Sequence, residues 1–521
     1  MTWRRLLRVF RANPYGSLLG LVAIGATLYC VGYPFAVVRY PPITDYPIHA
    51  SCASVLRHYL DPAWHFREQF EVHPIESPNV VMYAFGAVLA LFMPITWASK
   101  LMACAMIVQL PIGLSVLSWG MRKSPLWGLL GLGLAWSTLT QWGMLNHIGS
   151  VGLMATSIGL TLRLQDRPTR RAQFALVAAL FGVFITHVWR LPFTLVAIGL
   201  TTVVMYPYTR RIWPVVPPTM FGFFLLLVWR LAKRKDMGTP KLNAPDWPRF
   251  GEVKEALFGG YHLAEERLLA EGMLKAFGGV LVIAVVFWLI EGRYKQASRR
   301  VLAWNLGVTL LPLVLSAFFV LAFLTLPMEV GIWWYVFPRE IVTAVYVGLL
   351  VVPDLPRNPL ARAATVAIVV FAVGKMALFN AKQFFAFDVE AENMARVIAH
   401  IPPAPRLMFL VFDHSGSTRT ASPFVHLPQH VMAERGGWVS WHFASINLYP
   451  ITYRTGRADV PPQRPPRWEW TPHLYDHRRD SAFFDTFLIR SATDPTRTFG
   501  GDSKIVPVAR EGKWWIYRKT K

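Results

Sequence analysis

The sequence predicts a polytopic α-helical membrane protein that carries an α/β domain outside the membrane at its C-terminus. Of its 521 residues, 54% are hydrophobic and only 16% are charged, against about 25% charged residues in a typical soluble protein. Apolar runs long enough to cross a bilayer recur as far as residue 380. Beyond that point the apolar stretches shorten to strand length and turn residues separate them. This pattern excludes a disordered chain and most soluble enzymes.

The first apolar run, at about 17–38, follows a basic N-terminus and precedes no small-residue cleavage site. It therefore predicts a retained first helix rather than a cleaved signal. Ten further runs of suitable hydrophobicity follow, so the prediction is about 11 transmembrane helices. The later runs are at 96–120, 126–145, 149–164, 172–187, 191–208, 214–231, 274–291, 301–326, 336–353 and 360–380.

The formal charge of +23 is distributed in a way that supports this count. With the N-terminus in the cytoplasm, basic residues fall in the inner connections and are rare in the short outer ones, as the positive-inside rule requires. The inner connections hold Arg122 and Lys123; Arg167, Arg170 and Arg171; Arg210 and Arg211; Arg293, Lys295, Arg299 and Arg300; Arg357 and Arg362. We predict a plasma (inner) membrane location with an external or periplasmic C-terminus. The same dispersal gives no basic face for nucleic acid.

Three regions are predicted to lie outside the membrane. They are a long outer loop at 39–95, a second outer loop at 231–273, and an external domain at 381–521 with few membrane contacts. Residues 1–380 form the membrane domain. The apolar run 79–93 is too short to span and would invert the following loops if it did, so we expect a helix at the outer interface.

The first outer loop is dense in titratable groups. Asp45 stands just past the first helix, where a carboxylate can act as general base on an acceptor hydroxyl or hold a divalent metal. His49 lies four residues on, which places both on one face of a helix. Two ligands do not make a metal site, so no metal residues are assigned. The loop ends with further candidates, His73 and Glu76; the alternative is a solvated loop whose charges keep it out of lipid.

Arg190 and Arg339 are nearly the only basic residues in the short outer connections. A basic residue there opposes the charge rule, and an anionic phosphate at the outer face would offset it, since the arginine fork suits phosphate. The alternative is a structural ion pair, such as Arg339 with Glu329 or Glu340. His187 is a further candidate because Arg190 follows it closely. Trp333, Trp334 and Tyr335 indicate an interfacial aromatic belt, with a sugar-stacking platform as the alternative.

In layout the chain resembles the GT-C fold membrane glycosyltransferases, which use polyprenyl-phosphate-linked sugars, and within that family it resembles uncharacterised bacterial members. Asp45 matches the family's acidic position after the first helix. His73-Pro74, followed by Pro78 and Tyr83, is similar to the family's His-Pro-Pro…Tyr stretch. Tyr46 stands where many members have a second acidic residue, which argues against a paired-carboxylate metal site.

The resemblance implies transfer of a sugar from a polyprenyl-phosphate donor to a glycan, lipid or protein acceptor at the outer face. Asp45 would deprotonate the acceptor, and Arg339 with Arg190 would hold the phosphate. The other expected substrate-binding residues are His49, His187, Glu340, His73 and Glu76. A transporter or flippase, or a non-catalytic envelope assembly protein, is the alternative. The glycosyltransferase interpretation requires Asp45 and Arg339 to line one outward-facing cavity open to lipid.

Overall fold

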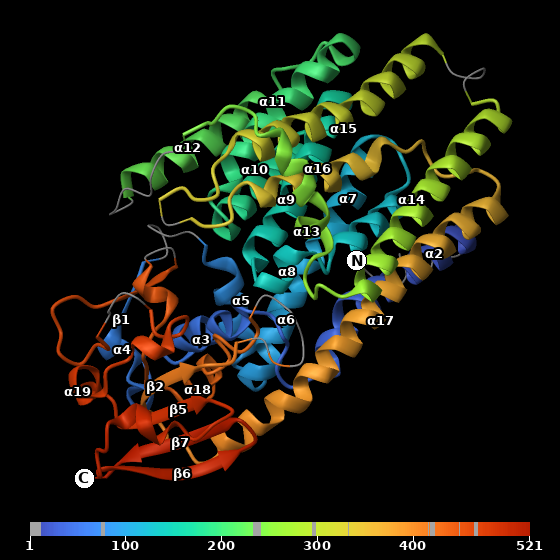
Figure 1. Ribbon diagram of the computed structural model, residues 1–521. Coiled ribbons are helices and arrows are strands. Elements are labelled where there is room, and N and C mark those ends of the chain that lie inside the picture. Colours follow the sequence, from blue (N-terminus) through green and yellow to red (C-terminus); the bar gives the residue numbers. More distant parts are fainter. Residues whose placement is uncertain are drawn as a thin grey trace.

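The computed structural model describes residues 12–520 except 74–78, 233–240, 294–297, 332, 415, 417–421, 447–448 and 463–466. Figure 1 shows a body of long helices with a C-terminal sheet region packed beyond one end of it, beside α3 and β1. The helix α17 runs from the body to the sheet region.

The helices of the body fall on the predicted apolar runs, with one exception at 126–145. Within the described residues, six helical stretches are long and apolar enough to cross a membrane, and large apolar side chains on them, such as Leu28 and Val203, are exposed. These features describe a multi-pass membrane protein; the count of eleven spans and their orientation stay predictions. The helices are α2 (Pro14–Ala36), α6 (Ile95–Ile107), α7 (Gln109–Gly120), α9 (Leu145–Asp166), α10 (Arg170–Thr186), α11 (Arg190–Thr209), α12 (Val216–Ala232), α14 (Ala264–Ile290), α15 (Arg299–Thr325), α16 (Pro338–Gly348) and α17 (Pro359–Ile398).

The run 126–145 was expected to form one spanning helix, and that expectation is wrong. It forms a 3₁₀ helix, η2 (Pro125–Leu134), followed by the short α8 (Thr138–Trp142). The backbone of η2 packs closely against α7. A Cβ atom at Gly128 would lie only 1.9 Å from the Ser115 hydroxyl oxygen. Residues 127–134 are all buried by protein, so their hydrophobicity serves the interior of the body rather than a lipid-facing surface.

The first outer loop folds into several short elements. They are α3 (Tyr46–Arg57), η1 (Pro62–Trp64), α4 (Phe66–Gln69), β1 (Phe70–Val72) and α5 (Val81–Leu89). Helix α5 lies within the run 79–93, where a short helix was expected. The second loop contributes η3 (Trp247–Glu252) and α13 (Val253–Phe258).

The C-terminal region is an α/β unit, as its strand-length apolar stretches predict. Its sheet has the order β3-β2-β5-β7-β6, with β2 parallel to β3 and β5, and β7 antiparallel to β5 and β6. The strands are β2 (Arg406–Val411), β3 (Trp438–Val439), β5 (Thr486–Arg490), β6 (Ile505–Glu511) and β7 (Trp514–Lys519), with α18 (Gln429–Arg435) and α19 (His477–Asp480) beside them. Residue 380, the expected domain boundary, falls inside the 40-residue helix α17.

The C-terminal region is docked on the first outer loop. Strand β1 pairs antiparallel with β4 (Ile451–Tyr453), and the Tyr40 hydroxyl donates to Glu434 at 2.7 Å. Buried residues of α3 and α18, among them Tyr46 and Val431, share one hydrophobic core. This shared core joins the C-terminal region to the membrane domain.

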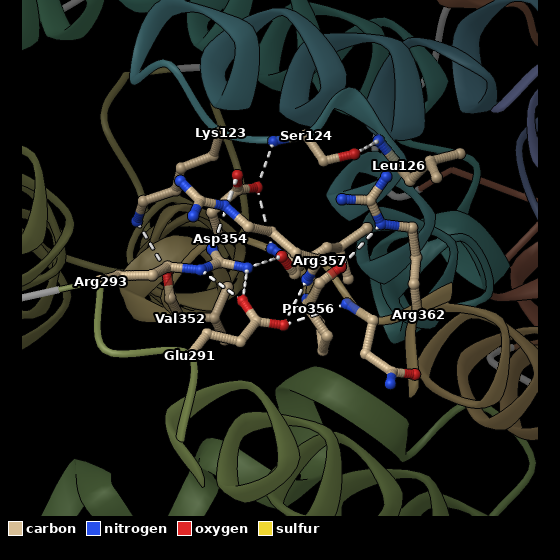
Figure 2. A network of polar contacts seen from close by, with 12 residues as sticks. Lys123, Ser124, Leu126, Glu291, Arg293, Val352, Asp354, Pro356, Arg357 and Arg362 are labelled. Carbon is tan, nitrogen blue, oxygen red and sulfur yellow. Dashed lines mark hydrogen bonds and ion pairs between the residues drawn. The ribbon is translucent and has the colours of Figure 1, made fainter. Parts of the chain in front are cut away.

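The opposite end of the helices carries a polar network around Asp354 (Figure 2). Lys123 donates to two backbone carbonyls that follow α16, at 2.8 and 2.7 Å. Glu291 accepts from two backbone N–H groups ahead of α17, at 2.7 and 3.0 Å, and pairs with Arg293. Asp354 accepts from the backbone of Ser124 at 2.7 Å. These contacts tie together three of the predicted inner connections.

Candidate functional site

A central cavity of about 890 Å³ lies between the membrane body and the C-terminal region. Its walls come from the start of α3, the α8–α9 connection, the end of α10, the α15–α16 loop and the C-terminal region. Asp45 and Arg339 both line it, which meets the requirement that they share a cavity. The cavity is also lined by His49, His147, His187, His426, Tyr449 and Trp470.

Asp45 precedes α3 and is held from two sides. Its backbone N–H donates to the carbonyl oxygen of Trp142 at 3.2 Å, which fixes the start of α3 against the α8–α9 turn. Gly143 in that turn has φ 90°, and a Cβ there would lie 2.8 Å from the Asp45 Cβ, so this close approach needs glycine. The Asp45 side chain is 24% exposed, and its Oδ1 accepts a hydrogen bond from Nδ1 of His426 at 3.0 Å.

His426 is the side chain that positions the Asp45 carboxylate. Its ring is 3% exposed and stacks on Trp441 with the centroids 5.2 Å apart. A carboxylate only accepts, so Nδ1 carries the proton. Its Nε2 is buried and has no hydrogen-bond partner within the described part of the chain. The exposed member of the pair, and hence the one a substrate can reach, is Asp45. Sequence reasoning missed His426, which lies 381 residues from Asp45 and belongs to no motif.

His49 lines the cavity, but its ring is occupied by the scaffold. Nε2 donates to the carbonyl oxygen of Gly143 at 2.7 Å, and Nδ1 accepts from the hydroxyl of Tyr83 at 3.0 Å. Burial lowers the pKa of His49, which keeps the ring neutral in this arrangement. The ring therefore anchors the Gly143 turn to α3 and α5.

Arg190 forms a buried, two-pronged ion pair with Glu340. Its two terminal nitrogens lie 2.9 and 3.0 Å from the carboxylate oxygens, and the side chains are 2% and 4% exposed. One nitrogen also lies 3.2 Å from the His147 ring. The pair borders a small pocket beside the central cavity rather than the cavity itself. Of the two roles considered for Arg190, the geometry favours the structural ion pair, and Glu340 belongs to it.

Arg339 is held by neutral groups instead. Its guanidinium donates to the carbonyl oxygens of Tyr335 and Trp334 at 3.0 and 2.7 Å, and lies 3.4 Å from Nε2 of His187. Residues 331 and 335 both have positive φ, which turns the α15–α16 loop so that its carbonyls meet the guanidinium. Among the ion pairs of the described residues, none involves Arg339. The half-buried charge faces the cavity without a carboxylate partner there.

Besides Arg190 and Glu340, the expected residue His73 does not line the cavity. The backbone N–H of His73 donates to the carbonyl oxygen of Pro450 at 2.6 Å, and its ring Nε2 lies 3.2 Å from a carboxylate oxygen of Glu71. His73 therefore lies at the β1–β4 junction, outside the cavity wall. Glu76 lies outside the described residues.

The donor set around Asp45 does not fit a zinc site. No group of three His, Cys, Asp or Glu side chains gathers as a metal site within the described ranges. Both ring nitrogens of His49 have partners, which leaves only Asp45 and His426 as adjacent donors. Three or more protein ligands are usual in zinc sites.

The aromatic residues expected as an interfacial belt form part of the cavity wall. Trp333 and Trp334 line it, and the Trp334 ring packs edge-on against Trp142 at a centroid distance of 5.0 Å. Tyr449 and Trp470 face them from the C-terminal region. The cavity therefore presents apolar ring surface beside its charged groups.

The fold has a solved counterpart. The crystal structure of ArnT from Cupriavidus metallidurans bound to undecaprenyl phosphate is similar to this chain with a TM-score of 0.52 and 12% sequence identity. The match covers 97% of this chain and 98% of that one. At this identity the likeness shows the fold, which is GT-C-like with a C-terminal sheet region. No protein-family model matches the chain, and no curated protein matches it.

Proposed function

We propose that this protein is an integral membrane glycosyltransferase that moves a sugar from a polyprenyl-phosphate donor to an envelope acceptor at the outer face of the membrane. The observation that carries the proposal is that Asp45 and Arg339 line the same cavity. The shared fold with a protein whose structure is bound to undecaprenyl phosphate supports the choice of donor.

Arg339 is the residue proposed to hold the donor phosphate. Backbone carbonyls and a histidine ring orient its guanidinium, so the positive charge is fixed in place but not neutralised. Charge-assisted hydrogen bonds from such a fork match phosphate oxygens. The same contacts stabilise the negative charge that grows on the phosphate as it leaves.

Asp45 is the proposed general base. The acceptor hydroxyl oxygen bonds to the anomeric carbon of the sugar while the bond from that carbon to the phosphate oxygen breaks. The hydroxyl proton passes to Asp45, and the polyprenyl phosphate departs with the electron pair. The hydrogen bond from His426 holds one carboxylate oxygen, leaving the other for the acceptor.

The remaining cavity residues support these two. The buried Arg190–Glu340 pair and His187 surround Arg339, and His49 fixes the turn beside Asp45. The rings of Trp334 and Trp470 offer apolar faces on which a sugar can stack.

The test compares Asp45→Asn with Asp61→Asn in cells that lack the native protein. Asp61 lies in the same outer loop but outside the cavity wall. With Asp45→Asn, the lipid-linked sugar donor should accumulate and the modified envelope acceptor should disappear, because the general base is gone. With Asp61→Asn both should match the wild type. A normal sugar profile with Asp45→Asn at normal protein levels would remove Asp45 from the mechanism.

A further inference from the structure

A second cavity, of about 590 Å³, lies at the other end of α3. We call it the basic cavity, because Arg39, Arg57 and Lys100 line it together with a single carboxylate, Glu434. Helix α3 has 12 residues and so a length of about 18 Å. Asp45 stands at its start and Arg57 at its end, which makes the basic cavity distinct from the central cavity.

The carboxylate in the basic cavity does not balance its cations. Glu434 pairs with Arg39 at 3.1 Å and also accepts from the Tyr40 hydroxyl. Lys100 is buried, donates to the carbonyl oxygen of Val38 and lies 4.2 Å from the centre of the Trp97 ring. Neither Arg57 nor Lys100 forms an ion pair within the described part of the chain. The Asp388 carboxylate attracts Lys100 from beyond the cavity wall, but its hydrogen bonds go to the backbone N–H groups of Arg39 and Tyr40.

Arg57 is the least satisfied of these cations. Its side chain is half-buried, and its Nε is buried without a hydrogen-bond partner among the described residues. Burial lowers the pKa of the neighbouring His58, so that ring adds no charge of its own near neutral pH. A buried donor without a partner costs stability unless a ligand or water supplies the acceptor.

The basic cavity lies between the ends of two candidate membrane spans. It reaches from Val38, just past the end of α2, to Ile95 at the start of α6. Beside it, Leu91 and Phe92 of the α5–α6 turn and Trp97 of α6 are exposed, and Phe92 is 78% exposed. Apolar side chains at the end of a span belong at the surface of a bilayer, where lipid phosphates lie. On the predicted topology, Arg39, Arg57 and Lys100 also lie at the outer face, where the positive-inside rule makes basic residues rare.

The geometry points to a binding site for the phosphate-bearing headgroup of an anionic phospholipid. Arg57 and Lys100 hold the phosphate, and the acyl chains extend along Leu91, Phe92 and Trp97. The N-terminus of α6 opens on the same space through Ile95 and Thr96, and its dipole favours an anion. This site is independent of the sugar-transfer proposal, because none of these residues lines the central cavity.

The test measures binding of dihexanoyl phosphatidic acid to the purified full-length protein by calorimetry. Wild type should bind it, and Arg57→Gln should weaken binding roughly tenfold through loss of a charge-assisted contact. The matched control is Arg67→Gln, an exposed arginine of the same loop that does not line the cavity and should bind as wild type does. Arg57→Lys, which keeps the charge but not the fork, should fall between them.

Two further measurements separate a lipid from a free phosphate. Phe92→Ser should weaken binding of the lipid and leave any binding of inorganic phosphate unchanged. Dihexanoyl phosphatidylcholine, whose headgroup has no net charge, should bind the wild type much more weakly. Equal binding of the two lipids by wild type, equal binding by Arg57→Gln and wild type, or inorganic phosphate binding as tightly as phosphatidic acid would each overturn the proposal.

Discussion

The polar network around Asp354 and the central cavity lie at opposite ends of the same helices and use their charges differently. In the network, Lys123 and Glu291 form hydrogen bonds with backbone groups in the connections between helices. In the cavity, Asp45 has a single side-chain partner among the described residues, and the groups there that hold Arg339 are neutral. Buried charges that join one helix connection to another build the fold, whereas charges held within their own loop at a cavity wall can meet a ligand.

Arg190 tests that distinction most directly, because it lies near the central cavity but forms a buried ion pair with Glu340. Arg190→Met should lower the free energy of unfolding by about 3–5 kcal/mol, because it leaves the Glu340 carboxylate buried and alone. The double variant Arg190→Met/Glu340→Leu should recover much of that loss. Thermal unfolding in detergent gives the measurement. If the single variant stays stable but loses donor binding, Arg190 belongs with Arg339 and the comparison is wrong.

Arg339 should show the opposite behaviour. Arg339→Gln removes the charge proposed to stabilise the leaving phosphate, and the rate of sugar transfer should fall by about 10²–10³-fold. Thermal stability should change little, because the carbonyl oxygens bonded to the guanidinium are partly exposed and can bond to water instead. The assay is transfer by purified protein reconstituted with donor and acceptor. A large loss of stability with this variant would place Arg339 among the structural charges.

Lys123 represents the network. Lys123→Met leaves two buried carbonyl oxygens without their donor, and each unsatisfied polar group costs about 1–3 kcal/mol. We expect a lower unfolding temperature with an unchanged transfer rate per folded molecule. Loss of transfer at full stability would mean that the two ends of the helices are functionally coupled.

His426 should give the smallest effect, because it acts through Asp45. His426→Leu removes a donor to the carboxylate, and kcat should fall roughly tenfold with KM unchanged, the size of a modest charge-assisted hydrogen bond. His426→Asn, whose amide can donate from near the position of Nδ1, should restore most of the rate. A change in KM alone, with no rescue by Asn, would make His426 a substrate contact and not a positioning residue.

Two site residues could be identified from their position relative to the predicted spans. Asp45 was identified because it follows a spanning helix, and Arg339 because a cation on the outer side opposes the charge pattern. The same rule could not separate Arg339 from Arg190, since their difference lies in a partner, Glu340, that is 150 residues from Arg190. His426 and the docking of the C-terminal region on α3 depend on tertiary packing alone.

The helices of the membrane body could largely be predicted from hydrophobicity. Hydrophobicity marks the elements that lipid or protein must cover, and ten of the eleven predicted runs coincide with α-helices. It does not reveal whether an apolar run faces lipid or protein, which is why the 3₁₀ helix η2 was mistaken for a span. Periodicity also could not show that α17 continues past residue 380 into the C-terminal region.

The division of labour between Asp45 and Arg339 can be measured directly by binding of undecaprenyl phosphate to purified wild type, Asp45→Asn and Arg339→Gln. In the proposed mechanism Asp45 acts on the acceptor, so Asp45→Asn should bind this lipid phosphate within about twofold of wild type while transferring no sugar. Arg339→Gln should bind it at least tenfold more weakly. Wild-type affinity in Arg339→Gln would contradict the account.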